Sequence, residues 1–246
     1  MTLKSLFLSV LLTFCWQIYS KAQVRLIDHI LIVNGSVGQS SDSKKYQEGI
    51  DFIKKAIHKN YQIQSIDVVG NYSEWERTTQ QLKAESSKSF LLIFYGHSNS
   101  TPNDIHFHFE GKDLKISEAG KFLKEAGVNA GIIWSSECGK RAVKMLANKN
   151  VKILGAMELE DMDNEPALSE VLGNVLSEGV DRNNDKVADL CEIHQQAKNQ
   201  VNLWYQIRDL IQLETIVLDG DGDGKGTIVP EEKDRLQGVK LGLKMK

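Results

Sequence analysis

The chain has 246 residues, of which 41% are hydrophobic and 26% are charged, and its formal net charge is −3. This composition can supply a hydrophobic core and excludes a wholly disordered chain. The slightly acidic balance also argues against a nucleic-acid-binding protein, which would be broadly basic.

The first 22 residues have the three parts of a secretory signal peptide. Lys4 supplies the positive charge, an apolar run follows from Leu6 to Trp16, and the small residues Ser20 and Ala22 stand where a signal peptidase cuts. The run is shorter than the roughly 20 apolar residues that a membrane span needs. We therefore expect a secreted or periplasmic protein with no membrane association once residues 1–22 are removed.

Two cysteines, Cys138 and Cys191, remain after that cleavage. Two are too few for a disulfide framework, even in an oxidising compartment. They could form one bridge, or one of them could be a reactive thiol.

Beyond the signal peptide, apolar runs alternate with amphipathic helical patterns. The predicted strands are 28–34, 63–69, 90–95, 131–135 and 151–157, and the predicted helices are 43–60, 74–83, 117–126, 140–147, 168–176 and 190–211. A small hairpin is predicted over 104–116. Strands that alternate with helices indicate a parallel sheet, and continuous apolar strands are typical of a sheet covered on both faces. The sequence therefore predicts an α/β fold with a mainly parallel central sheet flanked by helices.

Reactive side chains follow two of the predicted strands. His97 comes two residues after the strand 90–95, and Cys138 comes three residues after the strand 131–135. Ligands of open α/β sheets bind at the carboxyl ends of the strands. A nearby imidazole and the start of the next helix would both favour the thiolate form of Cys138. The plain alternative is a buried small apolar cysteine and a surface histidine.

An apolar strand followed by Gly-His, and about forty residues later an apolar strand followed by Cys-Gly, resembles the caspase-like clan of cysteine peptidases. Within the clan the chain looks most like bacterial legumain-like proteins. The resemblance implies a three-layer caspase-like fold over 23–230 and hydrolysis of protein or peptide substrates without a catalytic cofactor. It also implies that His97 is the general acid and base and Cys138 the nucleophile, with the backbone N–H groups of Cys138 and Ser98 holding the oxyanion.

Two residues depart from the clan's pattern. Ser98 stands where a glycine usually follows the histidine, and Glu137 stands where a small residue usually precedes the cysteine. A carboxylate beside the thiol would oppose formation of the thiolate. The alternative function is therefore a catalytically inactive caspase-like module that binds calcium or a partner.

A second enzyme class fits the same segment. The run Gly96-His97-Ser98-Asn99-Ser100 resembles the nucleophile elbow of an α/β-hydrolase esterase, with Ser98 as the nucleophile. The general base would then come from later in the chain, from one of His106, His108 and His194.

The loop 181–192 has the oxygen-ligand spacing of an EF-hand calcium site. Its predicted ligands are Asp181, Asn183, Asp185, Val187, Asp189 and Glu192. Lys186 occupies the sharp-turn position that normally holds glycine. We expect a structural Ca²⁺ here, and the alternative is an acidic loop that caps the following helix.

A second acidic loop spans 219–227, with Asp219, Asp221 and Asp223 alternating with glycine. Pro230 falls at the twelfth position of the EF-hand register, where it offers no side-chain ligand. The loop is either a cation site of irregular form or a solvated turn. Residues 231–246 are predicted to be a charged C-terminal tail.

Overall fold

The structure is a computed structural model that describes residues 26–35, 40–84, 89–127, 129–158, 165–231, 234 and 239–244. The signal peptide predicted over 1–22 lies outside the described residues. Within the described part of the chain, no helix is both long enough and apolar enough to cross a membrane.

A six-stranded sheet forms the centre of the domain, in the order β10-β8-β7-β3-β1-β2. The strands are β1 (His29–Asn34), β2 (Ser65–Val69), β3 (Phe90–Tyr95), β7 (Ala130–Ser135), β8 (Val151–Glu158) and β10 (Glu214–Asp219). Neighbouring strands pair in parallel, except that β10 runs antiparallel to β8. The predicted mainly parallel sheet is confirmed, with one antiparallel strand added at its edge.

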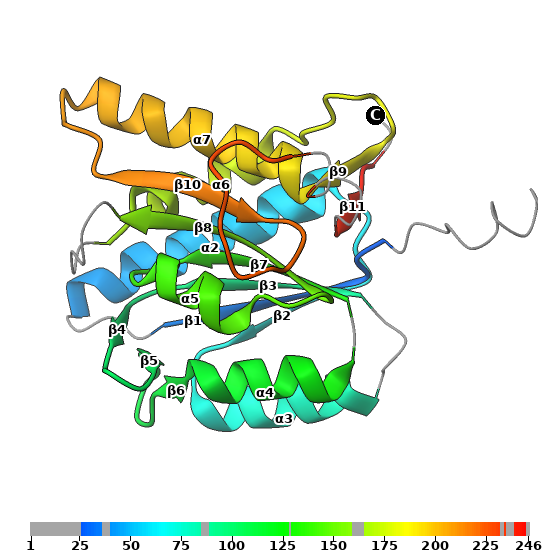
Figure 1. Cartoon of the computed structure of the whole chain (residues 1–246), viewed down its shortest axis with the longest axis vertical. Helices are drawn as coiled ribbons and strands as arrows, with labels where there is room; N and C mark the ends of the chain where they lie inside the picture. The colour runs from blue at the N-terminus through cyan, green and yellow to red at the C-terminus, as the bar shows by residue number, and fades with distance from the viewer. Residues whose placement is uncertain are drawn as a thin grey trace, which may run out of the picture.

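Helices cover both faces of this sheet (Figure 1). One face carries α2 (Ser40–Asn60), α6 (Ala167–Ser177) and α7 (Leu190–Ile207), and the other carries α3 (Tyr72–Ala84), α4 (Ile116–Ala126) and α5 (Gly139–Leu146). The molecule therefore has three layers, as the predicted fold class requires.

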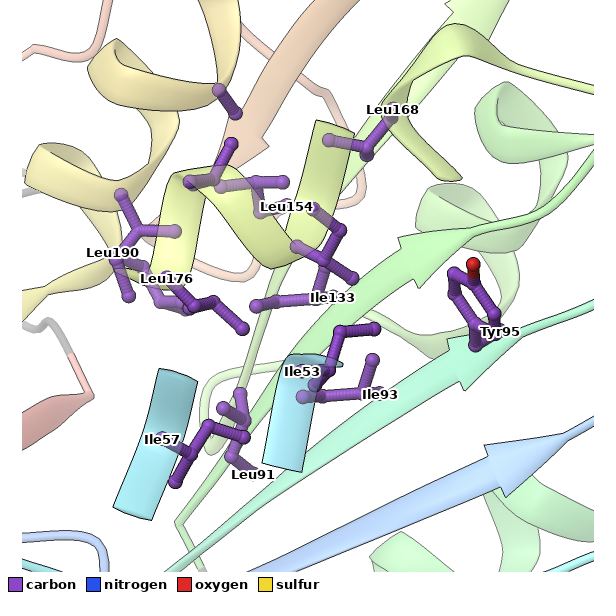
Figure 2. Packing of buried hydrophobic residues seen from close by; sticks show 14 of the residues in the cluster. Ile53, Ile57, Leu91, Ile93, Tyr95, Ile133, Leu154, Leu168, Leu176 and Leu190 are labelled. Carbon is purple, nitrogen blue, oxygen red and sulfur yellow. The ribbon is translucent and has the colours of Figure 1, made fainter. Parts of the chain in front are cut away.

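The core is divided between the two faces by the alternation of side chains along the strands. In β3, Leu91, Ile93 and Tyr95 face α2 and α6, whereas Leu92 and Phe94 face α3 and α4. Figure 2 shows the first of these clusters, in which side chains from α2, α6 and α7 meet those of β3, β7 and β8. Because both faces of β3 are buried, its sequence reads as a continuous apolar run.

A three-stranded sheet follows β3 and lies beside the ends of the central strands. It consists of β4 (Ser98–Ser100), β5 (Ile105–Phe107) and β6 (Leu114–Lys115), all antiparallel. The hairpin predicted over 104–116 is confirmed as β5 and β6, and β4 was not predicted.

Part of the segment predicted to be a charged tail belongs to the folded domain. β11 (Lys240–Gly242) pairs antiparallel with β9 (Val187–Asp189), which lies inside the first acidic loop. Val239 and Leu241 are buried, and Asp234 is buried as well. The alternation of apolar residues with lysines provides a strand with one buried face, which explains the docking.

Candidate active site

The two residues predicted to act together lie at the same edge of the central sheet. β3 and β7 are hydrogen-bonded neighbours, and Tyr95 pairs with Ser135 at the end of both strands. His97 follows two residues after this pair and Cys138 three residues after it. The sequence expectation that both side chains come from the carboxyl ends of neighbouring strands is confirmed.

Two glycines place the backbone of His97. A Cβ on Gly96, which has a φ of 150°, would lie 2.4 Å from the Cα of Gly35, so β1 and β3 can end this close together only with glycines at both positions. The N–H of Gly35 donates to the carbonyl of Tyr95 at 2.9 Å. The segment carrying His97 is thereby held against the end of β1.

Cys138 stands at a strained turn between β7 and α5. It has a φ of 62° and a ψ of 25°, and it is the N-cap residue of α5. A Cβ on the next residue, Gly139, would lie 1.7 Å from the carbonyl oxygen of Ala156. The turn thus contacts the backbone of β8 directly, and a side chain at Gly139 would force the turn away from β8.

The carbonyl of Glu137 fixes this turn from two sides. The indole Nε1 of Trp134 donates to it at 2.7 Å, and the hydroxyl of Ser98 donates to it at 2.9 Å.

Cys138 and Cys191 are not disulfide-bonded. The bridge considered from the sequence is therefore not present in the structure.

The Glu137 carboxylate binds the segment that follows the neighbouring strand β3. Its Oε1 lies 2.7 Å from Nδ1 of His97, and its Oε2 accepts from the N–H of Ser98 at 2.8 Å. Two expectations change. The acidic residue before the cysteine, expected to oppose the thiolate, contacts the histidine instead, and the Ser98 N–H, expected to hold an oxyanion, is already engaged.

Glu137 is ionised at neutral pH although it is almost fully buried. Burial alone would raise its pKa, but hydrogen bonds from His97 and from the Ser98 N–H outweigh burial and hold the pKa below its ordinary value. A buried carboxylate therefore faces the imidazole ring.

Tyr46, a residue that sequence reasoning did not single out, contacts the other ring nitrogen of His97. It lies on α2, is 3% exposed, and places its hydroxyl 3.0 Å from Nε2 of His97. Burial and the charge of nearby Glu165 raise the pKa of the Tyr46 hydroxyl far above its ordinary value, so it remains protonated. In the sequence, Tyr46 recurs at helical spacing with Ile50, Ile53 and Ile57. Its hydroxyl, on an otherwise apolar helix face, is the signal that could have singled it out.

The esterase interpretation is wrong. A nucleophile elbow requires a strand, a sharp turn and then a helix, but Ser98 begins strand β4 and is buried. The hydroxyl of Ser98 donates to the Glu137 carbonyl, and its oxygen lies 2.9 Å from the hydroxyl oxygen of Ser136. Two of the expected bases have other partners, since His194 is bonded to the carbonyl of Ile216 and His108 is paired with Asp113.

In the first acidic loop, carboxylates bind backbone amides of the loop itself. Asp181 accepts from the N–H groups of Asp185 and Lys186, at 3.1 Å each. Asp189 and Glu192 form a capping box at the start of α7, each accepting from the other's N–H. Asp189 and Glu192 thus cap α7, which is the alternative to a calcium site named in the sequence analysis. Calcium binding at 181–192 stays a prediction.

The second acidic loop gathers three carboxylates. Ligand atoms of Asp219, Asp221 and Asp223 all lie within 4.8 Å of one another. Asp219 is fully buried and accepts from the N–H groups of Gly222 and Gly224 at 2.6 Å each. Lys152 is buried beside the loop, and burial lowers its pKa against the opposing effect of the Asp219 and Asp221 charges. The charges of Asp219 and Asp221 thus act on a buried lysine, whose Nζ donates to the carbonyl of Lys149 at 3.2 Å.

Comparison with known proteins found distant structural likenesses. No family model and no curated protein matches the chain. Caspase-1 from Spodoptera frugiperda is 10% identical with a TM-score of 0.47, over 78% of this chain and 87% of that chain. The structure described as pro-sf-caspase-1 is 11% identical with a TM-score of 0.44, over 79% and 91%. Protein GSU0716 from Geobacter sulfurreducens is 15% identical with a TM-score of 0.42, over 79% and 92%. Neither a family nor an activity follows from likenesses at this distance.

Proposed function

We propose that the chain is a caspase-like cysteine endopeptidase of legumain-like type that acts on protein or peptide substrates through His97 and Cys138. The observation that carries the proposal is the placement of these residues beyond paired ends of β3 and β7. The contact between Glu137 and His97 adds to it, since it ties the histidine to the residue next to the thiol.

The proposed reaction uses the two side chains in sequence. Nε2 of His97 takes the proton of the Cys138 thiol, and the thiolate attacks the carbonyl carbon of the scissile peptide bond. When the C–N bond breaks, the imidazolium gives its proton to the leaving amine and a thioester remains. Water then hydrolyses the thioester, with His97 accepting a proton from the water and returning it to the sulfur. The N–H of Cys138 is the oxyanion donor in this scheme, because the Ser98 N–H is bound to Glu137.

The test is a digestion by the exported protein of a peptide mixture, with the products read by mass spectrometry. We expect cleavage in the unmodified protein, a loss of at least about a hundredfold in Cys138→Ala, and retained cleavage in the matched control Cys191→Ala. An unmodified, folded protein that cleaves nothing would contradict the proposal. So would a Cys138→Ala variant that cleaves as well as the unmodified protein.

The second candidate function is a catalytically inactive binding module. It is favoured because three groups that catalysis would use already have partners within the protein. Both ring nitrogens of His97 have partners, and the Ser98 N–H is bound to a carboxylate. A peptide that binds without being cleaved, with an affinity that Cys138→Ala leaves unchanged, would select this function.

Export and calcium complete the proposal. The predicted signal peptide supports secretion or periplasmic location. A structural Ca²⁺ in the loop 181–192 would stabilise the start of α7, which packs on the same face of the sheet as α2.

A further inference from the structure

The Glu137 carboxylate is built into the site by contacts to both of its oxygens. Oε1 lies 2.7 Å from Nδ1 of His97, and Oε2 accepts from the N–H of Ser98 at 2.8 Å and from the hydroxyl of Ser136 at 3.1 Å. The Glu137 side chain is only 5% exposed, whereas that of His97 is 32% exposed. The carboxylate is therefore fixed behind the ring, on the side away from solvent.

This arrangement determines which ring nitrogen carries the proton. An ionised carboxylate has no hydrogen to donate, so Nδ1 of His97 must donate to it. In the neutral ring Nε2 then has a lone pair, and the hydroxyl oxygen of Tyr46 lies 3.0 Å from it. Nε2 is thus prepared as the basic nitrogen.

We propose that Glu137 is a positioning residue that holds His97 as the Nδ1–H tautomer and stabilises the imidazolium formed when Nε2 takes the proton from the Cys138 thiol. This role rests on the function proposed above. The proton moves from sulfur to Nε2, which leaves a thiolate and an imidazolium, and the buried carboxylate offsets the new positive charge. Glu137 acts only through His97 and does not touch the substrate.

A purely structural role for Glu137 gives a different expectation. The same carboxylate also ties the turn after β7 to the segment after β3, through the Ser98 N–H. The variant Glu137→Gln separates the two roles, because its amide oxygen can still accept from that N–H. Its NH₂ group would then face Nδ1, which favours the tautomer with the proton on Nε2.

The experiment reads the tautomer and the thiol separately from peptide cleavage. The tautomer is read from ¹⁵N NMR of the His97 ring, assigned by comparison with His97→Gln. Thiol reactivity is read as the rate of Cys138 alkylation by iodoacetamide between pH 5 and 9, in a Cys191→Ala background. We expect Nδ1–H in the unmodified protein, Nε2–H in Glu137→Gln, and alkylation of that variant slower by about tenfold or more at pH 7.

Two further variants complete the test. Tyr46→Phe removes the contact at the other nitrogen, and we expect it to keep Nδ1–H and not to slow alkylation. Glu137→Asp restores a carboxylate and is expected to recover the Nδ1–H tautomer, which covers the case in which the amide variant fails to fold.

The inference is overturned if the unmodified protein carries its proton on Nε2. It is also overturned by a folded Glu137→Gln that keeps the tautomer and the alkylation rate of the unmodified protein. A protein that shows the expected tautomers and alkylation rates but cleaves no peptide would contradict the peptidase proposal alone.

Discussion

Lys186 adopts a backbone conformation that side chains rarely take, at a φ of 67°. A non-glycine residue in this region costs about 1–2 kcal/mol. Its position in the loop is also the one where calcium-binding loops of this spacing have glycine. Strain and positive charge therefore coincide at one residue of the predicted calcium site.

Replacing this residue tests both effects. We expect Lys186→Gly to raise the free energy of unfolding by about 1 kcal/mol without calcium, because glycine relieves the strain. It should also bind Ca²⁺ more tightly than the unmodified protein. The control Lys186→Ala removes the charge but keeps a Cβ, so it should gain calcium affinity only.

The measurements are urea unfolding and calorimetric titration with CaCl₂. If neither the unmodified protein nor either variant takes up calcium, the calcium prediction is refuted. The strain argument is refuted separately if glycine and alanine give equal stability.

At the same scale, the sequence located the candidate site but not its contacts. His97 and Cys138 could be predicted because each follows an apolar strand, and parallel strands end at one edge. The role of Glu137 was predicted wrongly, because adjacency in the sequence does not tell which way a side chain points from a turn. Tyr46 lies 51 residues from His97 along the chain, and no local pattern connects them.

At the scale of secondary structure, the first residue of β10 is hydrogen-bonded to the start of α6. This residue, Glu214, is buried and accepts from the N–H groups of Ala167 and Leu168 at 2.8 and 3.2 Å, at the start of α6. Burial raises the pKa of Glu214 to about 7, against the effect of these two hydrogen bonds. The folded protein therefore holds a proton on Glu214 that the unfolded chain loses at a lower pH.

The sign of the resulting pH dependence is fixed. A carboxyl with a raised pKa in the folded state contributes stability that is fully present below its unfolded value near 4.5 and is lost as pH rises through about 7. A shift of this size corresponds to about 3 kcal/mol. We expect Glu214→Gln to remove this part of the pH dependence.

The check is urea unfolding of both proteins at pH 5 and pH 8. From pH 5 to pH 8, the stability of Glu214→Gln relative to the unmodified protein should rise by about 3 kcal/mol at most. An equal difference between the two proteins at both pH values would contradict the assignment.

The elements themselves were predictable where one pattern dominated a whole segment. β3 is a continuous apolar run and β1 is nearly one, and the helices between the strands show regular apolar spacing. The helix predicted over 190–211 ends at Ile207 because Asp209 turns to a φ of 53°, which leaves Ile211 84% exposed. The apolar spacing continued beyond the helix end, so spacing alone could not place that end. β10 was missed although its residues Thr215 to Leu218 favour a strand.

At the scale of the whole molecule, the two ends of the described chain meet. The N–H of Ile27 donates to the carbonyl of Lys240 at 2.8 Å, and the N–H of Lys244 donates to the carbonyl of Asn60 at 2.8 Å. β11 thus joins the segment before β1, the end of α2 and the first acidic loop. Such pairing between distant segments is not visible in local sequence, which is why this segment was predicted to be a tail.

Leu241 tests whether this closure stabilises the domain. The side chain is 1% exposed, so Leu241→Ala should lower the free energy of unfolding by about 2–4 kcal/mol. The matched control Lys244→Ala, at an exposed position of the same segment, should lower it by well under 1 kcal/mol. Equal effects in urea unfolding would mean that the segment behaves as a tail after all.

The left-handed backbone at Cys138 limits how the chemistry of this position could change in evolution. Among nucleophilic side chains, those on an unbranched Cβ are tolerated at a positive φ, whereas a β-branched one is a severe steric outlier there. Substitution by serine would keep both the turn and a hydroxyl, but threonine would need a different backbone. The fold therefore permits replacement of the Cys138 thiol by the primary alcohol of serine, but not by the secondary alcohol of threonine.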